Sequence, residues 1–257
     1  MCFRFASLGS GSRGNATLVE AGATRVLVDC GYPMREFVAR CERLGFDPTS
    51  LSAILVTHEH GDHMRGVGAV SRRFGIPVWM THGTWRAADF GSINSLNLFA
   101  AHAGVFGIGD LAVTPVPVPH DAREPTQFVF DHRGARLGLL TDLGSITPRV
   151  VQAFDGVDAL LLECNHDSDM LERGPYPPSL QARVGGRFGH LNNAQAAAFL
   201  RSIDHTRLRH LVAAHLSEKN NSPELARRAL LGVSECLRDC LSLLMQDEIS
   251  DWFAIAT

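Results

Sequence analysis

Three histidines and two carboxylates fall within six consecutive residues, 58–63, and carry the strongest chemical signal in the sequence. They stand where a hydrophobic segment, residues 52–56, gives way to a turn at Gly61. Charged and polar side chains gathered at the mouth of a core are costly unless something pairs with them. Because imidazole and carboxylate together suit zinc, iron or manganese, the cluster predicts a divalent metal site.

The spacing divides this cluster into two sets of ligands. Successive side chains of an extended segment alternate in direction, so His58 and His60 point to the same side. Asp62 and His63 lie beyond the turn at Gly61 and can face a second ion. A loop that is rich in histidine by chance is the alternative. A lone His-x-His pair would leave it open, but the full His-x-His-x-Asp-His pattern at a strand end argues against it.

Further candidate ligands follow other segments that are rich in β-forming residues: His120, Asp142 and His215. Each of them alone is a weak signal, since a polar residue at a strand end is often structural. Their order after the first cluster strengthens the prediction, because a metal centre needs ligands from several parts of a chain.

Strands and helices must position these side chains, and the sequence supplies strands in two batches, each followed by helices. The predicted strands are residues 3–8, 17–20, 24–29, 52–56, 78–80, 111–118, 127–130, 136–140, 159–163 and 211–214. The predicted helices are residues 35–44, 64–74, 193–203 and 223–231, with an apolar helix from 237 and a last segment at 252–255 that forms a core strand or a dimer contact. This order predicts an α/β fold of four layers, with two sheets face to face and helices outside. Because no low-complexity linker divides the sequence, a single domain over residues 1–257 is expected.

The composition is that of an ordinary globular protein, 45% hydrophobic and 20% charged. No apolar run approaches the roughly 20 residues that span a bilayer, and the start lacks the pattern of a signal peptide, so no membrane partner and a cytoplasmic location are expected. The six cysteines contain no Cys-x-x-Cys pair and predict free, mostly buried thiols, with Cys236 and Cys240 on one helix face. The net charge of −3 argues against a protein wrapped in nucleic acid but allows a local basic groove.

The order of these motifs, each at a strand end, resembles the metallo-β-lactamase superfamily over residues 8 to about 215. The segment Leu27-Val28-Asp29-Cys30-Gly31 is similar to an early element of that superfamily. The resemblance implies the four-layer αβ/βα sandwich of the metallo-β-lactamase fold. It also implies two divalent metal ions, for which zinc is the main expectation and manganese or iron are the alternatives. It implies that one ion is held by His58, His60 and His120. It implies that the other is held by Asp62, His63 and His215, with Asp142 bridging the two.

The resemblance also implies a reaction. Two ions lower the pKa of a shared water or hydroxide, which attacks the substrate, and Asp62 takes part in this catalytic centre. The same arrangement serves lactams, thioesters and phosphodiesters. Residues 160–167, 189–197 and 214–217 are similar to the nuclease branch, in which a Glu orients a later Gly-His pair. Carried over, Glu163 orients His190, and His190 is the general acid. The alternative is that His190 only precedes a helix cap at Asn192 or Asn193.

Within that branch, five motifs resemble the YycJ/WalJ-like proteins, which are bacterial DNA exonucleases. They are SLGSGSRGN at 7–15, THEH at 57–60, NHD at 165–167, GPYP at 174–177 and HLSEKNN at 215–221. The 22 residues from His120 to Asp142 leave no room for a tRNA-docking arm, and the 73 from Asp142 to His215 leave none for a cap domain. The resemblance therefore implies a di-metal hydrolase that cleaves phosphodiester bonds in nucleic acid, with DNA as the substrate of an exonuclease.

A small-molecule phosphodiesterase or thioester hydrolase of the same fold is the alternative enzyme, and a metal-free binding protein would need a broken ligand set. A broad arginine-lined groove beside the metals would favour the nuclease, and a closed apolar pocket the small-molecule enzyme. Candidates for such a groove are Arg183, Arg187, Arg207 and Arg209, with charges on a helix surface as the default interpretation. The Gly/Ser run at 9–15 either offers backbone N–H groups to a phosphate or forms a tight hairpin, and His166 is a further candidate for a phosphate contact. The oligomeric state stays open.

Overall fold

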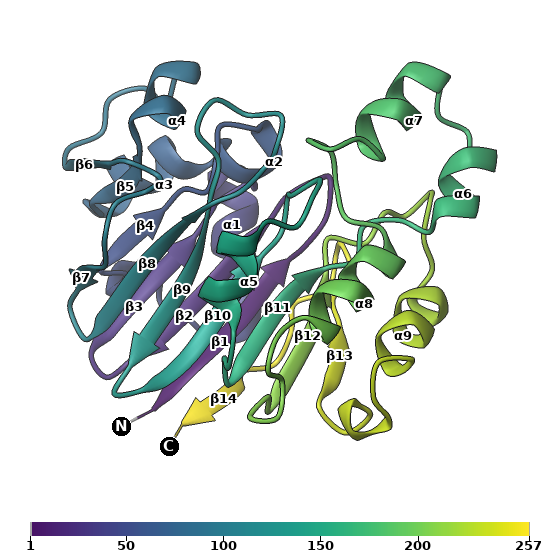
Figure 1. Cartoon of the computed structure of the whole chain (residues 1–257). Coiled ribbons are helices and arrows are strands. Elements are labelled where there is room, and N and C mark those ends of the chain that lie inside the picture. Colours follow the sequence, from purple (N-terminus) through teal and green to yellow (C-terminus); the bar gives the residue numbers. More distant parts are fainter. Residues whose placement is uncertain (1, 257) are drawn as a thin grey trace.

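Two seven-stranded sheets lie face to face in the computed structural model, which describes residues 2–256 (Figure 1). In spatial order the first sheet consists of β14 (Phe253–Ala256), β1 (Phe3–Gly9), β2 (Ala16–Ala21), β3 (Thr24–Val28), β4 (Ala53–Leu55), β5 (Val78–Thr81) and β6 (Leu96–Phe99). The second consists of β13 (Leu241–Leu243), β12 (His210–Ala214), β11 (Ala159–Glu163), β10 (Ala135–Leu140), β9 (Thr126–His132), β8 (Leu111–Pro117) and β7 (Phe106–Ile108).

Helices cover the outer face of each sheet. The first sheet carries α1 (Met34–Leu44), α3 (Val67–Phe74) and α4 (His82–Ala87). The second carries α5 (Pro148–Phe154), α8 (Asn193–Arg201) and α9 (Pro223–Leu231). Short elements complete the described chain: η1 (Pro48–Ser50), α2 (Gly61–Met64), α6 (Ser168–Arg173), α7 (Pro178–Val184) and η2 (Glu235–Leu237). The predicted four-layer αβ/βα sandwich is therefore confirmed.

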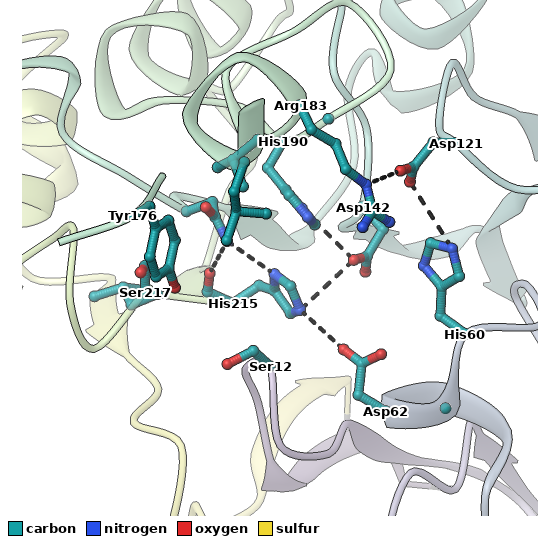
Figure 2. Close-up of a pocket in the computed structure, with 16 residues that line it drawn as sticks. Ser12, His60, Asp62, Asp121, Asp142, Tyr176, Arg183, His190, His215 and Ser217 are labelled. Atoms are coloured by element: carbon teal, nitrogen blue, oxygen red, sulfur yellow. Dashed lines mark hydrogen bonds and ion pairs between the residues drawn. The ribbon is translucent and has the colours of Figure 1, made fainter. Parts of the chain in front are cut away.

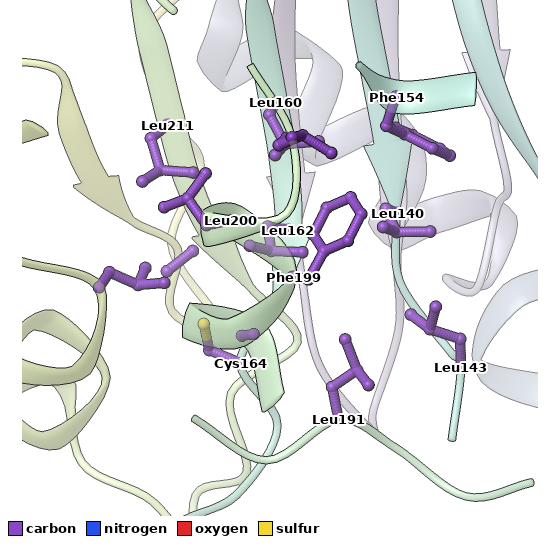
Figure 3. Close-up of a cluster of buried hydrophobic side chains, with 14 of the residues drawn as sticks. Leu140, Leu143, Phe154, Leu160, Leu162, Cys164, Leu191, Phe199, Leu200 and Leu211 are labelled. Atoms are coloured by element: carbon purple, nitrogen blue, oxygen red, sulfur yellow. The ribbon is translucent and has the colours of Figure 1, made fainter. Parts of the chain in front are cut away.

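Strand β11 shows why the sequence folds into layers. Its side chains alternate between the two faces of the sheet: Leu160 and Leu162 belong to the cluster under the helices, and Leu161 belongs to the cluster between the sheets. Figure 3 shows Leu160 and Leu162 packed with Phe154 of α5 and Phe199 of α8. A strand that is apolar on both faces is typical of parallel pairing under helices, and β11 pairs in parallel with both β10 and β12.

The carboxyl ends of the parallel strands meet at one edge of the sandwich. Strands β3 to β6 run parallel in the first sheet, and β10 to β13 run parallel in the second. In Figure 1 this edge is at the top, under α2, α6 and α7, and both chain ends lie at the opposite edge. Ligand sites of α/β proteins form at the carboxyl ends of parallel strands, so this edge is the expected place for a functional site.

The predicted strands all occur within two residues of their expected bounds, but two predicted helices differ in the structure. The helix expected at 64–74 ends before Gly75 as predicted but begins at Val67 as α3, because Gly66 separates it from the short helix α2. A Cβ at Gly66 would collide with the carbonyl of Tyr32, and its N–H donates to the carbonyl of Cys30 at 2.7 Å. The apolar helix expected from 237 is absent, because Leu237 ends η2 and the chain then turns into β13. The last predicted segment is β14, whose Ile255 is buried in the core.

The six cysteines are free, as predicted, although only Cys30, Cys41 and Cys164 are buried. Cys236 and Cys240 do not share a helix face, because the chain around them forms η2 and a turn. None of the helices between residues 2 and 256 is long and apolar enough to cross a membrane.

Candidate metal centre and active site

A cavity of about 350 Å³ opens at the edge where the strands end. Figure 2 shows side chains that converge on it from segments far apart in the sequence. Its polar floor includes His60, Asp62, Asp142, His190 and His215. Its apolar wall is formed by Tyr176, Leu180, Val184 and Leu216.

The first predicted ligand set is brought together in the structure. One nitrogen each of His58, His60 and His120 lies within 4.8 Å of the other two. His60 presents Nδ1, which is 3.3 Å from Nε2 of His120. These side chains follow β4 and β8, so the two sheets contribute to the same cluster.

The second predicted set is brought together as well. Single ligand atoms of Asp62, His63 and His215 lie within 4.8 Å of one another. Asp142 stands between the sets: its carboxylate forms one group with His58 and His63 and another with His215. Its Oδ2 is 3.4 Å from Nε2 of His63, and its Oδ1 is 3.5 Å from Nε2 of His215. The residues named from the sequence therefore form one continuous cluster.

An unusual backbone conformation recurs at the strand ends that build this cluster. Asp29, Asp142 and His215 have φ values of 60°, 53° and 55°, and they are three of the four non-glycine residues with positive φ among those described. This left-handed conformation costs about 1–2 kcal/mol for an ordinary L-residue. Hydrogen bonds hold it in place, because the three N–H groups donate to the carbonyl of Leu55, to Glu163 Oε1 and to Ser10 Oγ, respectively, at 2.8–3.1 Å.

Each buried imidazole is oriented through the nitrogen that faces away from the cluster. Nδ1 of His63 is 2.8 Å from Asp29 Oδ2, and Nδ1 of His120 is 3.0 Å from the carbonyl of Gly189. Nδ1 of His58 is 2.9 Å from Thr57 Oγ1, which in turn donates to Asp29. Such partners fix the tautomer and leave Nε2 as the lone-pair nitrogen, which is how metal-binding histidines are typically supported.

Several buried polar atoms of the cluster lack a partner. Within residues 2–256, no hydrogen bond is found for Nε2 of His58, Nε2 of His215 or Oδ2 of Asp142. An unsatisfied buried polar group costs about 1–3 kcal/mol. These atoms all face the same space, and imidazole nitrogen with carboxylate oxygen is the donor set that zinc, manganese and iron accept. The residues present therefore fit divalent metal ions.

The electrostatics of the cluster also fit a cation. Burial alone would raise the pKa of Asp142, but His215 and His63 outweigh it and hold this pKa well below its usual range. Burial lowers the pKa of His215, yet the carboxylates around it, Asp142 first, raise this pKa to about 10. Burial likewise lowers the pKa of His63, but the carboxylates around it, Asp142 first, raise this pKa well above its ordinary value. The carboxylates thus draw positive charge into the cavity, and a divalent ion can supply it in place of protons.

Glu163 lies next to His190, the residue with which the family resemblance pairs it. Glu163 Oε1 is 2.8 Å from His190 Nδ1, and its Oε2 accepts the backbone N–H groups of Leu143 and Leu191 at 3.3 and 2.9 Å. Burial works to raise the pKa of Glu163, but His190 and His215 outweigh it and the pKa falls to about 2. Glu163 is therefore an ionised acceptor that orients the ring of His190 toward the cavity.

Of the four arginines that were candidates for a groove, one lies at the cavity. Arg183 lines the cavity. Arg207 pairs with Asp158, and Arg209 donates to the carbonyl of Ile255, near the start of β12 and thus at the edge opposite His215. Arg187 is exposed and is not among the residues that line the cavity. His166 is buried and does not line the cavity either.

The Gly/Ser run at 9–15 forms a hairpin connection between β1 and β2. The N–H groups of Gly11, Arg13, Gly14 and Asn15 donate to acceptors inside the protein at 2.7–3.1 Å. Few backbone donors of this run are therefore left for a phosphate, although Ser12 lines the cavity.

Several residues of the site were not predicted from the sequence. Nδ2 of Asn15 is 3.1 Å from His63 Nε2, and Nδ2 of Asn165 is 3.2 Å from His215 Nδ1. Asp121 lies 3.8 Å from His60 Nε2. The motifs at 7–15 and 165–167 contained the two asparagines, and Asp121 directly follows His120, so their place in the sequence was a usable signal.

Comparisons with known proteins agree with this geometry. The sequence profile described as Beta-lactamase superfamily domain matches residues 24–215. Exodeoxyribonuclease YycJ of Bacillus anthracis is 35% identical over 91% of this chain and 90% of its own length. Exodeoxyribonuclease WalJ of Streptococcus pneumoniae is 32% identical over 89% of this chain and 87% of its own length.

Solved structures show the same fold. The metallo-β-lactamase fold protein YhfI from Bacillus subtilis has a TM-score of 0.75 at 15% identity and covers 97% of this chain and 99% of that protein. A diphosphatase of the PhnP family has a TM-score of 0.70 at 20% identity and covers 100% of this chain and 99% of that protein. The chain therefore belongs to the β-lactamase superfamily with the metallo-β-lactamase fold, in its YycJ/WalJ-like branch, and is a metal-dependent hydrolase.

Proposed function

We propose that the protein is a cytoplasmic nuclease that uses two divalent metal ions, zinc first, to hydrolyse phosphodiester bonds, and that it degrades DNA as an exonuclease. The Glu163–His190 pair beside the ligand cluster carries this proposal. A metal centre of this kind serves many reactions, but a departing sugar oxygen needs a proton donor. The relatives named exodeoxyribonuclease support DNA as the substrate.

Each residue of the cluster has a part in the proposed reaction. His58, His60 and His120 would hold one ion, Asp62, His63 and His215 the other, and Asp142 would bridge them. The bound ions would supply a nucleophile at neutral pH by lowering the pKa of a shared water and would stabilise charge on the attacked phosphate. Asn15 and Asp29 keep His63 in place for this purpose.

His190 would deliver the proton. Its Nδ1 is engaged by Glu163, so Nε2 is the nitrogen left to face the cavity. A donor held in this way protonates the leaving oxygen as the bond to phosphorus breaks. Glu163 keeps the tautomer and stabilises the ring while the proton is present.

The size of the cavity supports cleavage at a chain end. Its volume of about 350 Å³ lies near the lower limit of sites that take single small ligands, roughly 300–1,000 Å³. A terminal nucleotide suits such a space better than a continuous duplex does.

The same volume favours a second candidate, a small-molecule phosphodiesterase. The apolar wall formed by Tyr176, Leu180 and Val184 is what an enclosed small ligand would contact. This candidate uses the same ligands and the same proton donor, so only the substrate distinguishes it.

The test is to incubate the metal-loaded protein with double-stranded DNA labelled at one end, then at the other, with His58→Ala as the control. Progressive shortening by the wild type alone is expected, and the label that is lost first gives the polarity. A parallel RNA of the same sequence tests the preference for DNA. Intact DNA with both zinc and manganese, together with hydrolysis of bis-p-nitrophenyl phosphate, would contradict the exonuclease and favour the small-molecule enzyme.

A further inference from the structure

Arg183 stands on α7 at the rim of the cavity and has no part in the proposed metal centre. Among the described residues that line the cavity it is the one arginine. Its side chain is 62% exposed. In Figure 2 it reaches from the ribbon above the cavity toward the side chains of the floor.

The guanidinium of Arg183 is held at one nitrogen only. Its Nε donates to Asp121 Oδ2 at 2.5 Å. Between residues 2 and 256, no acceptor is found for its two terminal Nη groups. Since a guanidinium carries five N–H donors, four of them remain available on the edge away from Nε.

Asp121 fixes this arginine relative to the catalytic floor. Its other oxygen, Oδ1, is 3.4 Å from His120 Nε2 and 3.8 Å from His60 Nε2. Its backbone N–H donates to the carbonyl of Phe188 at 2.9 Å, which ties the loop after β8 to the loop after α7. The free edge of Arg183 is therefore held close to the ligand cluster before any substrate arrives.

We propose that Arg183 binds a substrate phosphate next to the one that is cleaved, through its two Nη groups, and that Asp121 is its positioning residue. The planar fork of a guanidinium matches two oxygens of a phosphate. The inference rests on the proposed function, because a polynucleotide carries a neighbouring phosphate and a simple phosphodiester does not. A purely structural ion pair between α7 and the loop after β8 is the competing explanation.

The test compares Arg183→Ala and Arg183→Lys with the control Arg187→Ala, which removes an exposed arginine outside the cavity. Steady-state rates are measured with the metal-loaded proteins on a DNA duplex and on bis-p-nitrophenyl phosphate, and thermal melting checks the fold. For each protein, kcat/KM on DNA is divided by kcat/KM on the small diester. In Arg183→Ala this ratio is expected to fall roughly ten- to a hundredfold, because the loss of a hydrogen bond to a charged group typically has an effect of this size. Arg187→Ala is expected to keep the wild-type ratio.

A salt series distinguishes a phosphate contact from a structural one. Removal of one phosphate contact lowers the slope of log KM for DNA against log salt by about one. Arg183→Ala should show this loss, whereas Arg183→Lys should keep the slope and recover only part of the ratio.

Active wild type together with an unchanged ratio and slope in Arg183→Ala would overturn the inference alone. A changed ratio with an unchanged slope in both variants would also overturn it, in favour of the structural ion pair. A folded, metal-loaded wild type without activity on DNA would overturn the proposed function and this inference with it.

Discussion

His190 is the residue on which the proposed chemistry depends most directly. It is supported from behind by Glu163, its Nδ1 is 3.7 Å from Asp142 Oδ1, and its ring centre is 5.2 Å from those of His120 and His215. It is not one of the seven residues proposed to hold the ions. Removing it therefore leaves the metal ligands themselves in place, which makes its contribution measurable on its own.

His190→Ala is expected to lower kcat on DNA by about 10²–10⁴-fold, because a positioned acid contributes this much. The loss on bis-p-nitrophenyl phosphate should be much smaller, since p-nitrophenolate leaves without a proton. His102→Ala, which changes an exposed histidine that is not among the residues lining the cavity, serves as the control. Equal losses on both substrates would contradict the role of His190 as proton donor.

Asp29 is predicted to act on metal affinity through His63. Asp29→Asn should weaken metal binding by about 10–100-fold, because partners of this kind orient the ligand and raise its basicity. Competition with a chromophoric chelator measures the affinity. Asp239→Asn, at an exposed carboxylate, is the control. Wild-type affinity in Asp29→Asn would show that the 2.8 Å contact with His63 is incidental.

At this scale the sequence predicted the residues of the cluster better than the residues that support them. His58 to His63 lie within one motif, so their types and spacing indicate a metal by themselves. Arg183 and Asp121 meet although 62 positions separate them, and no local pattern indicates such a pairing. Arg207 and Arg209 illustrate the converse, since a charged residue near a ligand in sequence can lie at the far end of the same strand.

At the scale of elements, helix α8 begins directly after the proposed acid, and its start is well defined. Asn192 accepts from the N–H of Gln195 at 2.7 Å, and the Gln195 side chain accepts from the N–H of Asn192 at 2.9 Å, which is a capping box. One of the two expected cap positions is therefore correct. The cap at Asn192 lies two residues after His190, so its presence is compatible with the proposed role of His190 as proton donor.

Asn192→Ala is expected to lower the free energy of unfolding by about 1 kcal/mol, the typical cost of losing an N-cap. Because Glu163 holds His190 independently of the cap, kcat on DNA should change little at temperatures where the variant is folded. Urea unfolding gives the first quantity and steady-state kinetics the second. A large loss of kcat without a change in stability would show that the cap, and not Glu163, positions His190.

Elements with regular patterning were predicted, and irregular ones were not. Strands such as β11 are buried on both faces, and their apolar runs are unambiguous. Short helices such as α6 and α7 bury few side chains, so they leave almost no periodic signal. The break at Gly66 depends on a contact with Tyr32, which the local sequence does not contain.

At the scale of the whole molecule, the site bridges two sheets. His58 to His63 follow β4 of the first sheet, whereas His120, Asp142 and His215 follow β8, β10 and β12 of the second. An ion shared by these ligands would join the two halves of the sandwich, and its loss would leave close carboxylates and unsatisfied imidazoles between them.

Metal removal is therefore expected to lower the melting temperature. An ion present at about a thousand times its Kd stabilises the native state by about 4 kcal/mol, which for a chain of this size corresponds to roughly 10 °C. Calorimetry before and after chelation, and again after reloading with zinc or manganese, measures the shift. His58→Ala should respond less. Identical melting temperatures of loaded and chelated wild type would contradict a metal that bridges the sheets.

The support beneath the site has a consequence for synthesis on the ribosome. Ser10 accepts the N–H of His215 at 2.9 Å, and the side chain of Gln246 holds the backbone of Arg13 and Gly14 at 2.7 and 3.1 Å. The loop at 9–15 is thus completed by segments that follow it by more than 200 positions. A nascent chain therefore cannot complete the proposed metal centre, even after its first histidines have emerged, until the segment around Gln246 has been translated.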